Sequence, residues 1–232
     1  MRYRAALFDL AGTLVEFSPR AYREVVRGMA GTLGVPASRF EPLWNDAIGR
    51  LETGSAESVE SALGGVVVRL GGVPEPDGVS ASVASLLSFA RDLLTPRTGA
   101  PEALLALRSM GLKLGLAANQ AAFVADLWPT CPLATCFDAA IFSCQAGVRK
   151  PDRAIYDLVA GHLGVEPREC LFVGDGGSNE LSGAAAAGMR AIQMRFSEDD
   201  PQDVAAIGRE SWTADQATDF EALVALVNSY AM

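Results

Sequence analysis

Five short apolar segments alternate with stretches of helical period through most of this chain, and this alternation limits its fold more than any other feature. The apolar segments are residues 3–10, 112–118, 137–142, 170–174 and 190–194. The helical stretches are residues 101–110, 120–128, 151–163, 178–188 and 217–229. Short strands that alternate with helices pair in parallel. The pattern predicts an α/β fold, an open doubly wound parallel sheet with helices on both faces.

Residues 15–97 depart from this alternation. They contain several helical stretches and no convincing buried strand, and glycines and prolines separate the stretches. We interpret them as a helical insertion. The chain is therefore expected to divide into an α/β core domain, residues 1–14 and 98–232, and a helical domain, residues 15–97.

The net charge restricts the classes of molecule that the protein is expected to bind. The formal net charge is -9 at pH 7, and such a protein repels nucleic acid and anionic membranes unless it carries a basic patch, which the sequence lacks. Because it also lacks an apolar run of about 18 residues and a cleavable leader, we expect a cytoplasmic protein. The sequence does not indicate an oligomeric state.

The cysteines show no metal-binding spacing. They form no CxxC pair, and His162 is the only histidine, so a zinc site is not expected. Reduced, mostly buried thiols are the simplest interpretation of Cys131, Cys136, Cys144 and Cys170. A disulfide between Cys131 and Cys136 is the alternative interpretation.

Polar residues stand where the predicted strands end, and ligands of open α/β sheets collect at those ends. Asp9 and Asp175 each stand at the end of an apolar segment and enter a loop that contains glycine, and two such carboxylates can hold a hard cation such as Mg²⁺. Lys150, one of two lysines, precedes a helix and can neutralise a phosphate or carboxylate. Taken singly, an Asp before Gly is more often a turn former and a lysine a solvated charge. Because Asp9, Asp175 and Lys150 all stand at such positions, a shared functional site is the better interpretation.

Four motifs in this order resemble the haloacid dehalogenase-like (HAD) hydrolase superfamily. They are FDLAGTL from Phe8, LGLAANQ from Leu114, GVRKPD from Gly147 and VGDGGSNE from Val173. The resemblance spans residues 1–194 and implies a Rossmann-like core, with residues 15–97 as the cap inserted between the first and second motifs. It also implies Mg²⁺ as cofactor and a small phosphorylated molecule as substrate.

The resemblance assigns a role to each matching residue. Asp9 would be the nucleophile and a metal ligand, joined at the metal by the backbone carbonyl of Ala11 and by Asp175. Lys150 would orient the nucleophile and the phosphoryl oxygens. Thr13, Ala118 and Asn119 take the phosphate-binding positions, and Glu180 takes that of a second acid supporting the metal or the lysine.

Two alanines depart from the family pattern. Ala11 stands where phosphatases of the family keep the aspartate that protonates the leaving group and then activates water. Such general acid-base catalysis contributes about 10²–10⁴-fold, so weak activity on alkyl phosphates is expected. Ala118 lacks the hydroxyl that usually donates to a phosphoryl oxygen, and Asn119 or backbone N–H groups would partly compensate.

Three functions therefore follow from the resemblance. The leading one is a Mg²⁺-dependent phosphatase acting through an aspartyl phosphate. The second is a 2-haloacid dehalogenase-like hydrolase of carbon–halogen bonds, in which Arg20 or Arg23 and Tyr156 would act with Asn119 and Lys150. The third is a catalytically weak metal- and phosphate-binding protein. Phosphonoacetaldehyde hydrolase activity is rejected, because it requires a cap lysine and residues 15–95 contain none.

Overall fold

A computed structural model describes residues 3–54 and 58–230 of the chain. Its centre is a six-stranded parallel sheet in the order β3-β2-β1-β4-β5-β6. The strands are β1 (Ala5–Phe8), β2 (Lys113–Ala118), β3 (Ala139–Phe142), β4 (Cys170–Gly174), β5 (Arg190–Met194) and β6 (Asp215–Ala217). The predicted α/β fold is confirmed, and β1 lies between β2 and β4.

Five strands lie in the segments predicted from their apolar character, although three of them are shorter than predicted. The sixth, β6, was not predicted, because its three residues, Asp215 to Ala217, carry no apolar run. It pairs with β5 at the edge of the sheet, where Ala217 alone of its residues is buried. Pairing with a neighbouring strand, rather than local sequence, therefore determines this strand.

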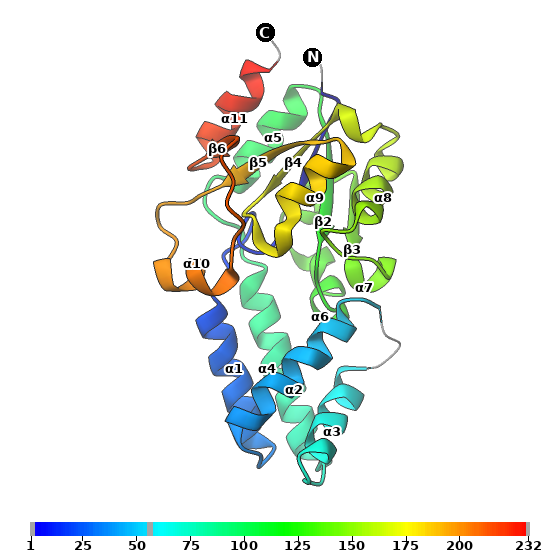
Figure 1. The fold of residues 1–232 in the computed structure, drawn as a ribbon, viewed down its shortest axis with the longest axis vertical. Coiled ribbons are helices and arrows are strands. Elements are labelled where there is room, and N and C mark those ends of the chain that lie inside the picture. Colours follow the sequence, from blue (N-terminus) through cyan, green and yellow to red (C-terminus); the bar gives the residue numbers. More distant parts are fainter. Residues whose placement is uncertain (1–2, 55–57, 231–232) are drawn as a thin grey trace.

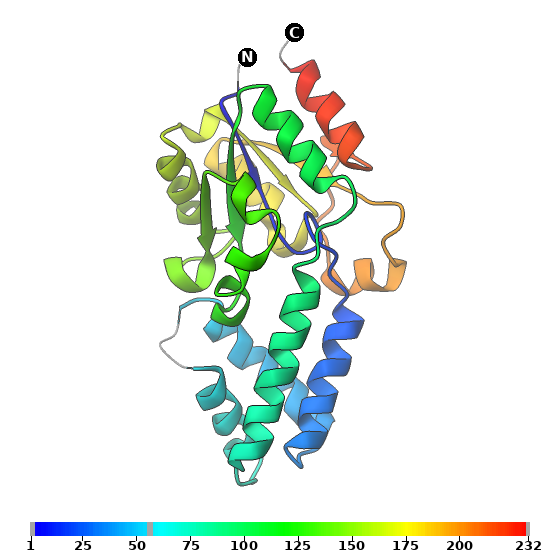
Figure 2. The same ribbon diagram turned by 180° about the vertical axis from the view of Figure 1, so that it is seen from behind.

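Helices cover both faces of the sheet (Figures 1 and 2). One face carries α8 (Arg153–Leu163) and α9 (Glu180–Ala187), and the other carries α5 (Ala100–Ser109) and α11 (Phe220–Ser229). Each layer encloses its own apolar cluster, because alternate residues of a strand point to opposite faces: Leu7 packs in one cluster and Phe8 in the other.

Shorter helices fill the connections between these elements. The α-helices among them are α6 (Ala122–Ala125), α7 (Ser143–Ala146) and α10 (Pro201–Ile207). The 3₁₀ turns are Trp128–Thr130, Ala134–Cys136, Pro167–Glu169 and Gly177–Asn179. The α-helices found within the predicted stretches 120–128 and 178–188 are shorter than those stretches, and a 3₁₀ turn lies next to each of them.

Four helices between β1 and β2 form the insertion at the lower end of Figure 1. They are α1 (Pro19–Thr32), α2 (Ala37–Leu51), α3 (Val59–Arg69) and α4 (Pro76–Leu93). The side chains of Ser18 and Ser58 accept hydrogen bonds from the first turns of α1 and α3, as N-cap residues do. The helices enclose their own apolar cluster around the fully buried Phe40 and Trp44. We call α1–α4 the cap; domain borders at residues 14/15 and 97/98 stay a prediction.

Three contacts hold the cap against the core. Val15 forms an antiparallel bridge with Pro96, so the two connections run side by side. Arg20 of α1 pairs with Asp200 and Asp203 at the start of α10, with its Nε 3.1 Å from Asp203 Oδ1. Glu52, at the end of α2, pairs with Arg149 at 3.2 Å. The cap is therefore fixed at both its α1 and α2 ends.

The four cysteines are free, and burial raises the pKa of the Cys131 and Cys144 thiols and that of Cys170 to about 12. Cys131 and Cys170 are buried, whereas Cys136 and Cys144 are half-buried. Within residues 3–54 and 58–230, every helix is too short or too polar to cross a membrane.

The packing of α8 on β2 generates a stability prediction. A Cβ on Gly115 would lie 2.5 Å from Val159 Cγ1 and 3.0 Å from Leu163 Cδ1, so Gly115→Ala is expected to lower the free energy of unfolding by about 1–3 kcal/mol. Gly161 of α8 has no atom within 4 Å of such a Cβ, and Gly161→Ala should raise that free energy by about 0.5–1 kcal/mol. Urea unfolding of both variants checks the contrast, and equal effects would contradict it.

Candidate active site

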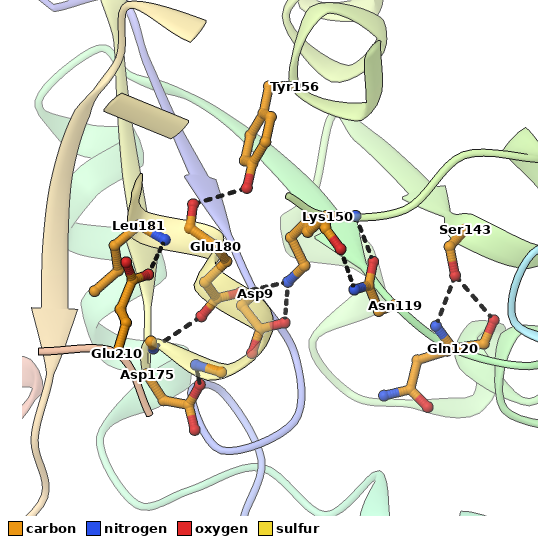
Figure 3. A network of polar contacts seen from close by, with 12 residues as sticks. Asp9, Asn119, Gln120, Ser143, Lys150, Tyr156, Asp175, Glu180, Leu181 and Glu210 are labelled. Carbon is orange, nitrogen blue, oxygen red and sulfur yellow. Dashed lines mark hydrogen bonds and ion pairs between the residues drawn. The ribbon is translucent and has the colours of Figure 1, made fainter. Parts of the chain in front are cut away.

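The carboxyl ends of three neighbouring strands bring the predicted site residues together. Asp9 follows β1, Asn119 follows β2 and Asp175 follows β4. Lys150 precedes α8 and reaches the same place (Figure 3). Gly12 closes the loop after β1 with a φ of 91°, and a side chain at this position would collide with the Asp175 carboxylate. Glycine is therefore required where the two acidic loops meet.

A buried lysine joins two of the acids. Lys150 Nζ donates to Asp9 Oδ1 and, at 2.6 Å, to Glu180 Oε2. The side chains of Lys150 and Glu180 are each 2% exposed, and that of Asp9 is 10% exposed. One ammonium group thus holds two carboxylates that are shielded from water.

Burial and charge shift the protonation equilibria of this cluster. Desolvation raises the pKa of Asp9, and the nearby Asp175 carboxylate adds to this effect while Lys150 opposes it. Desolvation and Asp9 together raise the pKa of Glu180 well above its usual value. Burial alone would lower the pKa of Lys150, but the two carboxylates outweigh it and raise it. The lysine therefore stays charged, and the surplus negative charge favours a further cation.

Asn119 holds the backbone of Lys150. Its Nδ2 donates to the Lys150 carbonyl at 3.0 Å, and its Oδ1 accepts from the Lys150 N–H at 2.8 Å. Asn119 also lines the cavity in front of the strand ends. This pairing places the lysine, a contact that the resemblance does not imply.

The other two predicted phosphate-binding residues are fully buried. Ala118 packs within the apolar core. Thr13 follows Gly12, and its Oγ1 has no hydrogen-bond partner in the described part of the chain. Each is next in sequence to a residue of the site, Ala118 to Asn119 and Thr13 to Gly12. Their phosphate-binding roles stay predictions.

Arg209 is a site residue that the sequence analysis missed. Its Nε lies 3.0 Å from Asp175 Oδ2, and its other end pairs with Asp199 at 2.8 Å. These two carboxylates raise the pKa of Arg209 against the opposing effect of burial. Arg209 follows α10 outside every recognisable motif, so only the fold brings it to Asp175.

Glu180 and Tyr156 take supporting positions. Glu180 Oε1 accepts from the Gly176 N–H at 3.1 Å while its Oε2 binds Lys150. Tyr156 is fully buried, and its hydroxyl donates to the Glu180 carbonyl at 2.7 Å. Glu210 accepts from the Leu181 N–H at 2.6 Å. The loop after β4 is therefore fastened from several sides.

The residues present fit a divalent cation. Asp9, Asp175 and Glu180 each offer a carboxylate oxygen, and these oxygens lie within 4.8 Å of one another. Asp9 Oδ2 is buried and accepts no hydrogen bond within residues 3–54 and 58–230. Both oxygens of Glu180 and both oxygens of Asp175 accept hydrogen bonds within the site, so Asp9 Oδ2 is the carboxylate oxygen left open to a cation.

A cavity of about 350 Å³ opens in front of these residues. The strand-end loops contribute Asp9, Ala11, Asn119, Lys150, Asp175 and Glu180 to its wall, and the cap contributes Tyr22, Ile48, Glu52, Phe89 and Leu93. The site thus lies between core and cap.

The cap arginines considered for the dehalogenase reaction lie elsewhere. Arg20 is bound to Asp200 and Asp203, and Arg23 is exposed on α1. Neither lines the cavity, and neither does Tyr156. The arginine and the tyrosine expected for the dehalogenase reaction are therefore not among the residues that line the cavity.

Two curated phosphatases are similar to this chain in sequence. Phosphoglycolate phosphatase of Yersinia pseudotuberculosis is 33% identical over 201 residues, which cover 83% of this chain and 81% of that protein. Glyceraldehyde 3-phosphate phosphatase of Methanopyrus kandleri is 32% identical over 130 residues. That match covers 55% of each protein, so it spans about half the length of this relative.

The fold has a solved counterpart in L-2-haloacid dehalogenase of Xanthobacter autotrophicus. The two structures align with a TM-score of 0.65 and 22% identity, covering 97% of this chain and 98% of that one. This likeness concerns the fold, including the helical cap. The sequence model of the haloacid dehalogenase-like hydrolase family matches residues 3–188 of this chain. The chain therefore belongs to the haloacid dehalogenase-like hydrolases.

Proposed function

We propose that the protein is a Mg²⁺-dependent phosphatase that hydrolyses a small phosphorylated molecule through a phosphoryl group carried on Asp9. One observation carries this proposal. Lys150 binds one oxygen of Asp9, while the other oxygen is buried without a partner among the described residues, next to Asp175 and at the cavity. The similarity to two phosphatases supports it.

Asp9, Asp175 and the backbone carbonyl of Ala11 would hold the magnesium ion. When bound, it supplies positive charge that lets a phosphate dianion approach the acidic cluster. The Arg209 guanidinium keeps Asp175 oriented through its Nε contact at 3.0 Å. Glu180 supports the site indirectly, because its carboxylate binds Lys150 and the Gly176 N–H.

The reaction has two displacements at phosphorus. In the first, a carboxylate oxygen of Asp9 forms a bond to phosphorus, the bond to the leaving oxygen breaks, and the leaving group departs with its electron pair. In the second, water attacks the same phosphorus, the Asp9–phosphorus bond breaks and inorganic phosphate forms. Lys150 fixes the nucleophile and balances charge that develops on the phosphoryl oxygens.

Ala11 determines which substrates suit this mechanism. Its methyl group lines the cavity but neither donates nor accepts a proton. A leaving group that is stable as an anion, such as an acyl or aryl oxygen, departs without a general acid, whereas an alkoxide does not. The proposed substrates are therefore phosphate esters or anhydrides with good leaving groups.

A carbon–halogen hydrolase is less well supported. Tyr156 uses its hydroxyl on the Glu180 carbonyl, and Arg20 is held by two aspartates of the core. A chloride-release assay with 2-chloropropionate tests this alternative directly. Chloride release without phosphate release from any phosphomonoester would replace the phosphatase proposal, and Mg²⁺ binding without either would favour a binding protein.

The nucleophile gives the first functional prediction. Asp9→Asn keeps the side-chain volume but removes the attacking carboxylate, so phosphate release is expected to fall below about 1% of the parent rate. A malachite green assay measures the released phosphate, and urea unfolding checks that the variant is folded. Greater residual turnover by a folded variant would overturn the covalent mechanism.

The metal site gives a second prediction. Asp175→Asn should weaken Mg²⁺ binding by about tenfold or more, because a hard cation loses one of two carboxylate ligands. Calorimetric titration measures the affinity, and Asp157→Asn, which removes the same charge from an exposed ion pair with Arg153, is the control. Equal affinities of the two variants would place the metal elsewhere.

Ala11 gives a third prediction. With an aryl phosphate the first displacement needs no acid, but hydrolysis of the phosphorylated Asp9 still needs an activated water, so the phosphoenzyme should accumulate. Rapid-quench kinetics should show a burst of phenolate before the steady state. Ala11→Asp should remove the burst and raise turnover of alkyl phosphates by about tenfold or more. The absence of a burst, together with no gain in the variant, would contradict the assigned role of position 11.

A further inference from the structure

Four aromatic side chains are among the residues that line the cavity. Phe17, Tyr22 and Phe89 line it together. The ring of Tyr22 lies 5.4 Å from that of Phe89 and 6.5 Å from that of Phe17, measured between ring centroids. Phe123 adds a fourth ring from the core side. Tyr22 thus joins Phe17 and Phe89, and we call the four rings the aromatic wall.

The Tyr22 ring is held in this wall by its hydroxyl. Trp44 Nε1, from the centre of the cap, donates to the Tyr22 hydroxyl at 3.0 Å. Burial raises the pKa of Tyr22, so this hydroxyl stays neutral at ordinary pH. The wall therefore presents an uncharged surface that is fixed by the apolar cluster of the cap.

Charged side chains at the cavity are unevenly distributed. Among the residues that line it in the described part of the chain, Lys150 alone is basic, and both Asp9 and Glu180 already bind it. The cap contributes only an acid, Glu52, whose side chain is 21% exposed. The neighbouring Arg149 and Arg209 are occupied by Glu52 and by Asp175 and Asp199.

This arrangement suits one class of leaving group. An aromatic ring gains from burial against other rings, whereas a carboxylate here would lose water without meeting a free cation. It would face the carboxylate of the Glu52–Arg149 pair, because Glu52 lines the cavity and Arg149 does not. The cavity of about 350 Å³ also limits size. Because an apolar cavity of roughly 150 Å³ holds one benzene ring, a single ring and a phosphoryl group fill the space.

We propose that the cap selects phosphomonoesters of uncharged aromatic alcohols, such as phenols, and that Glu52 excludes those whose leaving group carries a carboxylate. This inference rests on the proposed phosphatase function. It separates the chain from the Yersinia relative, whose named substrate, phosphoglycolate, is a carboxylate.

The experiment compares phenyl phosphate with 4-carboxyphenyl phosphate. Their leaving phenols are similar in acidity, so the missing acid at Ala11 affects both alike. The parent should favour phenyl phosphate by about tenfold or more in kcat/KM, from repulsion and desolvation of the carboxylate. Equal values, or preference for the carboxylated ester, would overturn the inference while leaving the phosphatase proposal in place.

Variants assign this preference to Glu52. Glu52→Gln retains an oxygen for Arg149 but loses the charge, and it should reduce the ratio of the two kcat/KM values by about fivefold. Glu24→Gln removes the same charge from an exposed position of α1 and should leave the ratio as in the parent. An unchanged ratio in a folded Glu52→Gln protein would show that Glu52 does not select.

A binding measurement distinguishes this inference from the proposed function. Benzylphosphonate and 4-carboxybenzylphosphonate are not hydrolysed, and calorimetry in the presence of Mg²⁺ measures their affinities. Tighter binding of benzylphosphonate by about tenfold is expected. If neither phosphate ester turns over but this preference holds, the phosphatase proposal fails and the selectivity of the cap stands. If the esters turn over and the phosphonates bind equally, the selectivity fails alone.

Discussion

The buried ammonium group of Lys150 is the interaction on which the site depends. It holds Asp9 and Glu180 together where neither acid has free access to water. Removing one partner of such a buried pair leaves an uncompensated charge and costs about 3–5 kcal/mol. Asn119 fixes the lysine backbone, and Tyr156 fastens the carbonyl of Glu180. Residues from the ends of two strands and from two helices are thus tied to one charge.

The core and the cap divide the chemistry between them. The strand-end loops supply the carboxylates and the lysine, and their positions follow from the parallel sheet. The cap supplies Tyr22 and Phe89 of the aromatic wall, and Glu52 at the end of α2. Ion pairs at Arg20 and Arg149 join the two parts, so the selectivity we propose would depend on contacts far from the phosphorus atom of the substrate.

The sequence predicted what local patterns encode. Apolar segments indicated five of the six strands, and the turn residues after them marked Asp9 and Asp175. The backbone hydrogen bonds of Asn119 and the ion pair of Arg209 were not predictable, because each joins segments 31 or more residues apart. The aromatic wall escaped prediction for the same reason: Phe17 before α1, Tyr22 on α1 and Phe89 on α4 come together only when the helices are packed.

Ala11 and the aromatic wall belong to different parts of the chain, yet they favour the same chemistry. A site without a general acid turns over only esters whose leaving oxygen is stable as an anion. An aromatic wall favours phenols over sugars or acids, because rings gain most from losing water. Phenolate is both the better leaving group and the better occupant. An alanine at position 11 is therefore compatible with the proposed phosphatase reaction when the cap restricts entry to esters that need no general acid.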